Sequence, residues 1–80
     1  MILMLTGSHC SYCTLLKDRL DAVGLEFTSV DVKSAEGEAF VTSLNVRTIP
    51  ILIKKVEGKA IMTLSGSDKP MSAYKEFFND

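Results

Sequence analysis

The residues of this chain best suited to chemistry are its two cysteines, Cys10 and Cys13, which two residues separate. A Cys-x-x-Cys pair closes a small disulfide and exchanges thiols with the disulfide of another molecule. An amphipathic segment follows, so Cys10 is expected beside the first backbone N–H groups of a helix, which stabilise a thiolate. We expect Cys10 to be the nucleophile. Cys13 lies one helical turn further on, beside apolar neighbours, and is expected to be the more buried, resolving thiol.

The same spacing is also half of a zinc site. A structural zinc site usually has four protein ligands, whereas the chain has one histidine, His9, and no second Cys-x-x-Cys. Zinc or an iron–sulfur cluster shared between two chains is therefore one alternative. A second is a pair of inert cysteines that pack beside a helix. The position of the pair ahead of an amphipathic helix favours redox chemistry, and we expect no metal site within one chain.

The segments around the cysteines predict a strand, a helix and a second strand. Residues 1–5 are a continuous apolar run, typical of a buried strand, and have neither the basic segment nor the length of a signal peptide. A helix is expected over residues 11–23, with Gly24 as its stop. Residues 26–32 alternate and contain β-branched side chains, which predicts a strand. The apolar stripe of the helix consists of Tyr12, Cys13, Leu16, Leu20 and Val23.

The second half of the chain predicts a helix, a hairpin and a last helix. Ser34 is a suitable cap for a helix over residues 35–44, although Gly37 weakens that prediction. Strands over residues 51–53 and 59–64 flank a turn at Glu57-Gly58. The last helix is expected over residues 70–78, with Ser67 or Asp68 as its cap, Pro70 in its first turn, and Tyr74, Phe77 and Phe78 on one face.

The element order is therefore βαβαββα, an α/β class. The first strand, helix and strand imply a parallel pair with a crossover helix, and the later hairpin adds antiparallel pairing. We predict one domain over residues 1–80, built as a four-stranded mixed sheet with three helices on its two faces.

Composition limits the function classes. Of the 80 residues, 46% are hydrophobic and 24% are charged, as in ordinary folded domains. The formal net charge of −1 provides no overall attraction for a phosphate backbone, so we expect no nucleic-acid partner. No apolar stretch reaches the roughly 18 residues of a membrane helix. With only two cysteines, a secreted disulfide scaffold is not expected, so the cytoplasm is the expected compartment. Nothing in the sequence demands more than a monomer, which we therefore expect.

The motif Cys10-Ser11-Tyr12-Cys13 is similar to the CPYC motif of glutaredoxins, and the element order matches that family over essentially the whole chain. The resemblance implies a thioredoxin-like fold and glutathione-dependent thiol–disulfide exchange. Ser11 replaces the proline of the family motif, so we expect a changed redox poise with the chemistry retained. Many glutaredoxins also have a lysine shortly before the motif, which this chain lacks.

The resemblance also implies a glutathione site. Thr48-Ile49-Pro50 resembles the TVP segment of the family, which has a cis proline and offers its backbone to glutathione. Gly66-Ser67-Asp68 resembles the glycine-rich turn that binds the γ-glutamyl end. Tyr12 is expected to line the groove, and Arg47 to attract the glycyl carboxylate. Simpler roles stay open: Asp68 as a helix cap, Tyr12 packed on the sheet, and Arg47 as a solvated loop residue.

The expected function is reduction of protein disulfides or glutathione mixed disulfides, including those of ribonucleotide reductase, with glutathione as reductant. A second hypothesis keeps both cysteines but takes electrons from thioredoxin reductase. It rests on a loose similarity of Leu64-Ser65-Gly66 and Pro70 to glutaredoxin-like hydrogen donors. Two other classes stay open: a cluster carrier that binds through Cys10, and an adaptor that docks a partner beside Pro50.

Overall fold

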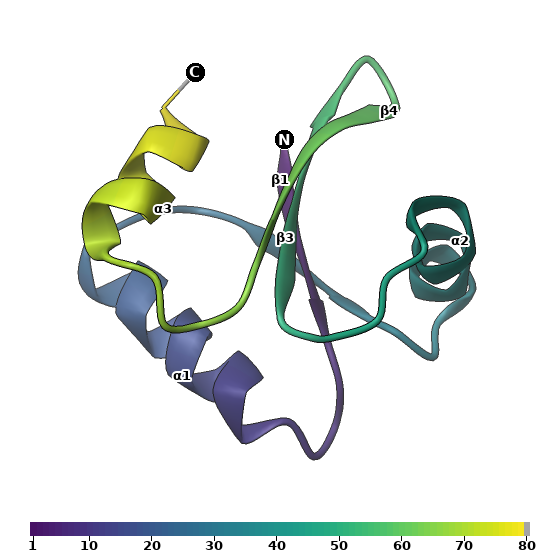
Figure 1. Cartoon of the computed structure of the whole chain (residues 1–80), viewed down its shortest axis with the longest axis horizontal. Helices are drawn as coiled ribbons and strands as arrows, with labels where there is room; N and C mark the ends of the chain where they lie inside the picture. Colours follow the sequence, from purple (N-terminus) through teal and green to yellow (C-terminus); the bar gives the residue numbers. More distant parts are fainter. Residues whose placement is uncertain (80) are drawn as a thin grey trace.

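A computed structural model of the chain describes residues 1–79. Its elements follow the predicted order βαβαββα, and most bounds agree with the prediction within two residues (Figure 1). The elements are β1 (Ile2–Thr6), α1 (Ser11–Ala22), β2 (Thr28–Asp31), α2 (Ala35–Leu44), β3 (Ile51–Val56), β4 (Lys59–Ser65) and α3 (Met71–Phe78).

The four strands form one mixed sheet in the order β2-β1-β3-β4. β1 pairs with β2 in parallel, and β3 pairs in antiparallel fashion with both β1 and β4. In this register Leu5 lies opposite Val30 on one side and Ile51 on the other. The hairpin turns at Glu57 and Gly58, whose φ angles of 53° and 81° are those that a tight two-residue turn requires. The predicted sheet is confirmed.

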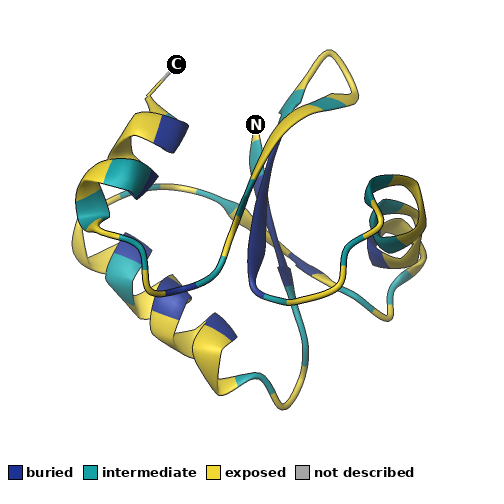
Figure 2. Ribbon diagram, viewed as in Figure 1, coloured by how far each residue is buried: buried dark blue, intermediate teal, exposed yellow. Residues whose placement is uncertain are grey.

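The helices cover both faces of the sheet, with α1 and α3 on one face and α2 on the other (Figure 1). Side chains alternate along a strand, so each face builds its own core. Figure 2 shows the buried residues concentrated on the central strands and on the inner sides of the helices. The core under α1 and α3 contains Met4, Leu16, Leu20, Leu52, Tyr74 and Phe77, and the core under α2 contains Leu3, Leu5, Val30, Ile51 and Ile53.

α1 positions the cysteines because its inner side is anchored in the core. Leu16 and Leu20 are fully buried, and the helix ends before Gly24, which adopts a φ of 72°. The predicted apolar stripe was wrong at both ends. Tyr12 is 63% exposed and the C-cap residue Val23 is 42% exposed, whereas the buried side of the helix consists of Cys13, Leu16 and Leu20.

α2 begins where predicted, with Ser34 as its cap. The Ser34 hydroxyl accepts from the Gly37 N–H at 3.0 Å and donates to the Asp31 carbonyl at 2.6 Å. Packing explains why residue 37 is a glycine, because a Cβ there would lie 2.0 Å from the Asp31 carbonyl oxygen. The glycine therefore permits the close approach of α2 to the end of β2.

Three parts of the prediction need correction. β3 runs over Ile51–Val56 and not only over residues 51–53, because Lys55 and Val56 continue the pairing with β4. β2 covers Thr28–Asp31 and not residues 26–32, because its partner β1 offers only residues 3–6 for parallel pairing. α3 begins at Met71 with Pro70 as its N-cap, and neither Ser67 nor Asp68 makes a side-chain cap. Other contacts hold the backbone of Ser67, as described below.

Within residues 1–79, no helix combines the length and the apolar character that crossing a membrane requires.

Candidate functional site

Cys10 and Cys13 form a disulfide at the junction between the β1 loop and α1. The two sulfurs are 2.30 Å apart and the two Cα atoms 5.2 Å apart. Cys10 is the N-cap of α1, and its Sγ accepts from the backbone N–H of Cys13 at 3.0 Å. The same N–H would stabilise a Cys10 thiolate after reduction, as would the positive end of the helix dipole.

The two sulfurs differ in exposure. Cys13 is only 4% exposed, because it lies on the inner side of α1 beside Leu16 and Leu20, whereas Cys10 is half-buried at the surface. An incoming thiol or disulfide therefore reaches Cys10 first. The predicted burial of Cys13 is confirmed.

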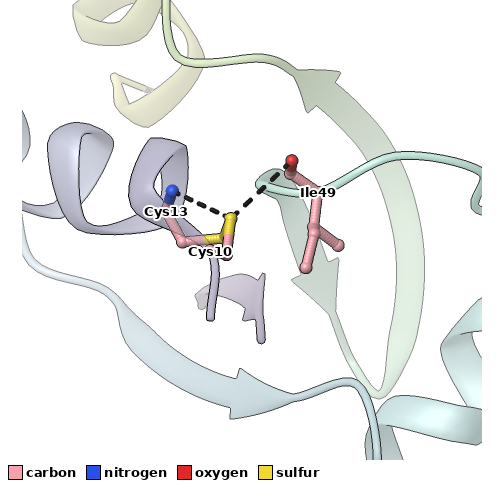
Figure 3. Close-up of a disulfide and its surroundings, with 3 residues drawn as sticks. All are labelled: Cys10, Cys13 and Ile49. Atoms are coloured by element: carbon pink, nitrogen blue, oxygen red, sulfur yellow. Dashed lines mark hydrogen bonds between the residues drawn. A yellow bond between two sulfur atoms is a disulfide. The ribbon is translucent and has the colours of Figure 1, made fainter. Parts of the chain in front are cut away.

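The segment before β3 closes the site from the other side. The Ile49 carbonyl oxygen lies 4.0 Å from Cys10 Sγ, as Figure 3 shows, and the Ile49–Pro50 peptide is cis, as the glutaredoxin resemblance implies. Ile49 also packs on the cysteine loop, because a Cβ on Gly7 would lie 2.9 Å from Ile49 Cδ1. The glycine therefore lets the Ile49–Pro50 segment approach the disulfide.

A groove of about 260 Å³ lies beside the cysteines, and we call it the Pro50 groove. Seven of the eight residues predicted to contact glutathione line it, although they come from three separate parts of the chain. Tyr12 contributes an exposed ring from the cysteine motif itself. The lining residues are Tyr12, Thr48, Ile49, Pro50, Gly66, Ser67 and Asp68.

The eighth predicted residue, Arg47, is exposed and lies in a neighbouring hollow of about 570 Å³. This hollow is lined by Val32, Val41, Val46 and other residues of α2 and the loop that follows it. It shares two residues, Thr48 and Ile49, with the Pro50 groove. Arg47 is therefore placed to reach the far end of a ligand that extends from one hollow into the other.

The loop that forms one wall of the Pro50 groove is held by two residues that the sequence did not identify as functional. Arg19 of α1 donates to the carbonyls of Ser67 and Lys69, and the Tyr74 hydroxyl of α3 donates to the carbonyl of Gly66. Tyr74 was predicted only as a core residue. The one signal for Arg19 was its position between Leu16 and Leu20, on the helix side that faces the fold.

Within residues 1–79, no three His, Cys, Asp or Glu side chains gather where an ion would fit. His9 is exposed and precedes Cys10 in the loop.

No protein-family model matches the chain, and no curated protein matches it in sequence. Solved structures do match in fold. A Fasciola hepatica thioredoxin has a TM-score of 0.72 at 20% identity, covering 96% of this chain and 75% of that one. A Malassezia sympodialis thioredoxin gives 0.73 at 16% identity, with coverages of 96% and 70%. A buckwheat glutaredoxin, solved as a complex with glutathione, gives 0.61 at 21% identity, also with coverages of 96% and 70%.

These likenesses establish the fold. The chain has the thioredoxin-like fold, with a four-stranded mixed sheet and three helices. Its Cys10–Cys13 disulfide fits a Cys-x-x-Cys redox motif at the start of the first helix.

Proposed function

We propose that this thioredoxin-fold redox protein is a glutathione-dependent thiol–disulfide oxidoreductase that reduces protein disulfides and glutathione mixed disulfides. One observation carries the proposal: the half-buried Cys10 lies against Ile49 of the Pro50 groove, which combines an aromatic ring, a segment with a cis proline and the Asp68 carboxylate. A ligand in this groove would present its sulfur to Cys10.

Reduction of the target takes two exchange steps. The Cys10 thiolate attacks one sulfur of the target disulfide, so a Cys10–sulfur bond forms and the other sulfur leaves as a thiolate. The Cys13 thiolate then attacks Cys10 Sγ, so the Cys10–Cys13 disulfide forms and the second target thiol is released. Two further exchanges restore the protein: one glutathione thiolate attacks Cys10 Sγ and frees Cys13, and a second attacks the glutathionyl sulfur and frees Cys10. When the sulfur bound to Cys10 is itself a glutathionyl group, an external glutathione attacks it directly. Two glutathione molecules supply the two electrons overall and become glutathione disulfide. The buried position of Cys13 keeps it from reacting with outside disulfides before Cys10 does.

The groove offers complementary groups for glutathione. The exposed Asp68 carboxylate is an acceptor for the ligand's ammonium group. The Ser67 and Asp68 N–H groups have no protein acceptor within residues 1–79 and are therefore donors for a carboxylate. Thr48 and Ile49 provide backbone for an extended peptide, and Arg47 provides a cation for the glycyl carboxylate.

A second candidate keeps the exchange chemistry but replaces glutathione by thioredoxin reductase as the electron source. The observations that favour it are the likeness to solved thioredoxins and the lack of a lysine shortly before Cys10. Both candidates include the disulfide of ribonucleotide reductase among the targets, and both describe a cytoplasmic monomer.

The test follows NADPH consumption with a small disulfide substrate. One assay contains glutathione and glutathione reductase, and the other contains thioredoxin reductase alone. We expect turnover in the first assay, and none in either assay after Cys10→Ser. Turnover only in the second assay would identify thioredoxin reductase, and not glutathione, as the electron source. Silence in both would favour a cluster carrier, which has visible absorption bands, or an adaptor whose biological activity survives Cys10→Ser.

Asp68→Asn tests the groove within the same assay. Loss of an exposed charge pair costs about 0.2–1 kcal/mol, so the KM for glutathione should rise roughly threefold while kcat changes little. Asp18→Asn is the matched control, because Asp18 is an exposed carboxylate of α1 outside the groove. An equal rise of KM in both variants would point to overall charge and not to the groove.

A further inference from the structure

Residues 66–69 follow β4 and lead toward α3, and we call them the groove loop because Gly66, Ser67 and Asp68 line the Pro50 groove. Two side chains from different helices bind its backbone. The Arg19 guanidinium of α1 donates from Nη1 to the Ser67 carbonyl and from Nη2 to the Lys69 carbonyl, the latter at 2.8 Å. The two nitrogens of one planar fork thus fix two carbonyls of the same loop.

Tyr74 of α3 binds the two ends of the groove loop, Gly66 and Lys69. Its hydroxyl donates to the Gly66 carbonyl at 2.8 Å and accepts from the Lys69 N–H at 3.2 Å. The ring itself is fully buried, so the hydroxyl position is set by the core. The Arg19 guanidinium lies 5.1 Å from the ring centroid, which links the two residues by a cation–π contact.

These contacts decide which backbone groups of the loop remain for a ligand. The carbonyls of Gly66, Ser67 and Lys69 are all bound by Arg19 or Tyr74. The N–H groups of Ser67 and Asp68 have no acceptor within residues 1–79. Neither Arg19 nor Tyr74 lines the Pro50 groove. Their effect on a ligand is therefore exerted through the loop.

We propose that Arg19 and Tyr74 are positioning residues that hold the groove loop in its ligand-binding conformation and thereby set the preference for glutathione disulfides over simple disulfides. This inference rests on the proposed function. Attack by Cys10 on a small disulfide without charged ends uses the cysteines alone and does not need the loop. Attack on glutathione disulfide, which has ammonium and carboxylate groups, needs the loop in place.

The experiment measures how fast the reduced protein is oxidised by glutathione disulfide and, separately, by bis(2-hydroxyethyl) disulfide. The variants are Tyr74→Phe, which keeps the ring, together with Arg19→Met and Arg19→Lys, the second of which keeps the charge but loses the fork. Lys75→Met is the control, because Lys75 is an exposed cation of α3 that, among the described residues, makes no hydrogen bond or ion pair with the loop. Circular dichroism and thermal unfolding establish that each variant is folded.

Each of the first three variants should slow oxidation by glutathione disulfide about tenfold, the effect of losing one or two hydrogen bonds. The rate of oxidation by bis(2-hydroxyethyl) disulfide should stay within about twofold of the wild-type rate, a change much smaller than the tenfold one. Lys75→Met should change neither rate. The proposal is overturned if the folded variants keep the wild-type ratio of the two rates, whether both rates stay or both fall together.

Failure of the proposed function has a different signature. A wild-type protein that shows no preference for glutathione disulfide would count against glutathione as the ligand. Hydrogen exchange of the Gly66 amide, which donates to the Pro50 carbonyl, then decides the inference about the loop, because neither variant removes that acceptor. Faster exchange in Tyr74→Phe and Arg19→Met, with Lys75→Met unchanged, would support a positioning role toward some other substrate. Unchanged exchange would overturn it.

Discussion

Replacing Gly37 by alanine is expected to destabilise the protein, although alanine is the better helix former. In an exposed helix this substitution gains about 1 kcal/mol. Here the new Cβ would lie 2.0 Å from the Asp31 carbonyl oxygen, 2.8 Å from the Asp31 carbonyl carbon and 2.9 Å from Val32 Cα. All three are backbone atoms, so no side chain can rotate away, and α2 must move off the end of β2.

The size of the effect follows from that movement. The shortest contact must lengthen from 2.0 Å to the 3.4 Å at which ordinary contact begins. Overpacking in a folded interior costs about 1–3 kcal/mol and occasionally more. Because such a close backbone contact belongs at the upper end, the net loss after the gain in helix propensity is about 2 kcal/mol. For a domain of this size that lowers Tm by roughly 10 °C.

Urea unfolding followed by circular dichroism measures the free energy of unfolding directly. Ala39→Gly provides the matched control, because Ala39 is an exposed interior position of the same helix. It should lose about 1 kcal/mol through helix propensity alone. Our reasoning is refuted if Gly37→Ala is as stable as the wild type or more stable, since the propensity gain would then exceed the steric cost.

Two further predictions concern local contacts. Ser34→Ala removes the cap of α2 and should lower the free energy of unfolding by about 1 kcal/mol in the same urea experiment. Ser34→Thr retains a capping hydroxyl and should therefore keep most of the wild-type stability. The hydrogen bond and charge of Asp21 raise the pKa of Lys17 above 10.5, so Asp21→Asn should return it toward that value in an NMR titration. Because the partner of Lys17 is an anion, the pair stabilises the folded state slightly while Lys17 is charged. This stabilisation is fully present below pH 10.5 and is lost as the pH rises through the raised pKa of Lys17. An unchanged Lys17 titration in Asp21→Asn would contradict the assignment of the cause.

The parts of the fold that were predictable are those that local patterns determine. The apolar run of β1, the Ser34 cap and the Glu57-Gly58 turn each have a short-range physical cause, and the structure has all three in place. The cysteine pair belongs to the same class, because its position at the start of α1 follows from the strand and helix beside it.

The parts that were wrong or missed depend on contacts between distant segments. Tyr12 looked like part of the apolar stripe, but Cys13 and Leu16 occupy the inner side of α1, and the Tyr12 ring is exposed beside the Pro50 groove. The cap of α3 was assigned wrongly, because Pro70 is the N-cap and the Ser67 backbone is instead bound by Arg19, 48 residues earlier. Gly37 is unfavourable for a helix, and its reason lies in the fold, because a Cβ at this position would lie 2.0 Å from the Asp31 carbonyl oxygen.

The predicted glutathione-contact residues lie between these two cases. Only the family resemblance suggested that residues 48–50 and 66–68 belong to one site, because no pattern within either segment points to the other. The structure brings both segments beside Cys10 in the Pro50 groove. It places Arg47 in the adjoining hollow, so a role for Arg47 depends on a ligand long enough to reach both.

The most direct test of the account is to trap the intermediate that it requires. Reduced Cys13→Ser protein, treated with glutathione disulfide, retains the nucleophile but lacks the resolving thiol, so it should stop at the mixed disulfide. We predict one glutathionyl group on Cys10 by mass spectrometry, and NMR shifts concentrated at the Ile49 amide and the groove loop amides. An unmodified Cys10, or an adduct whose shifts lie elsewhere on the molecule, would contradict the proposal that glutathione reacts at this cysteine from the Pro50 groove.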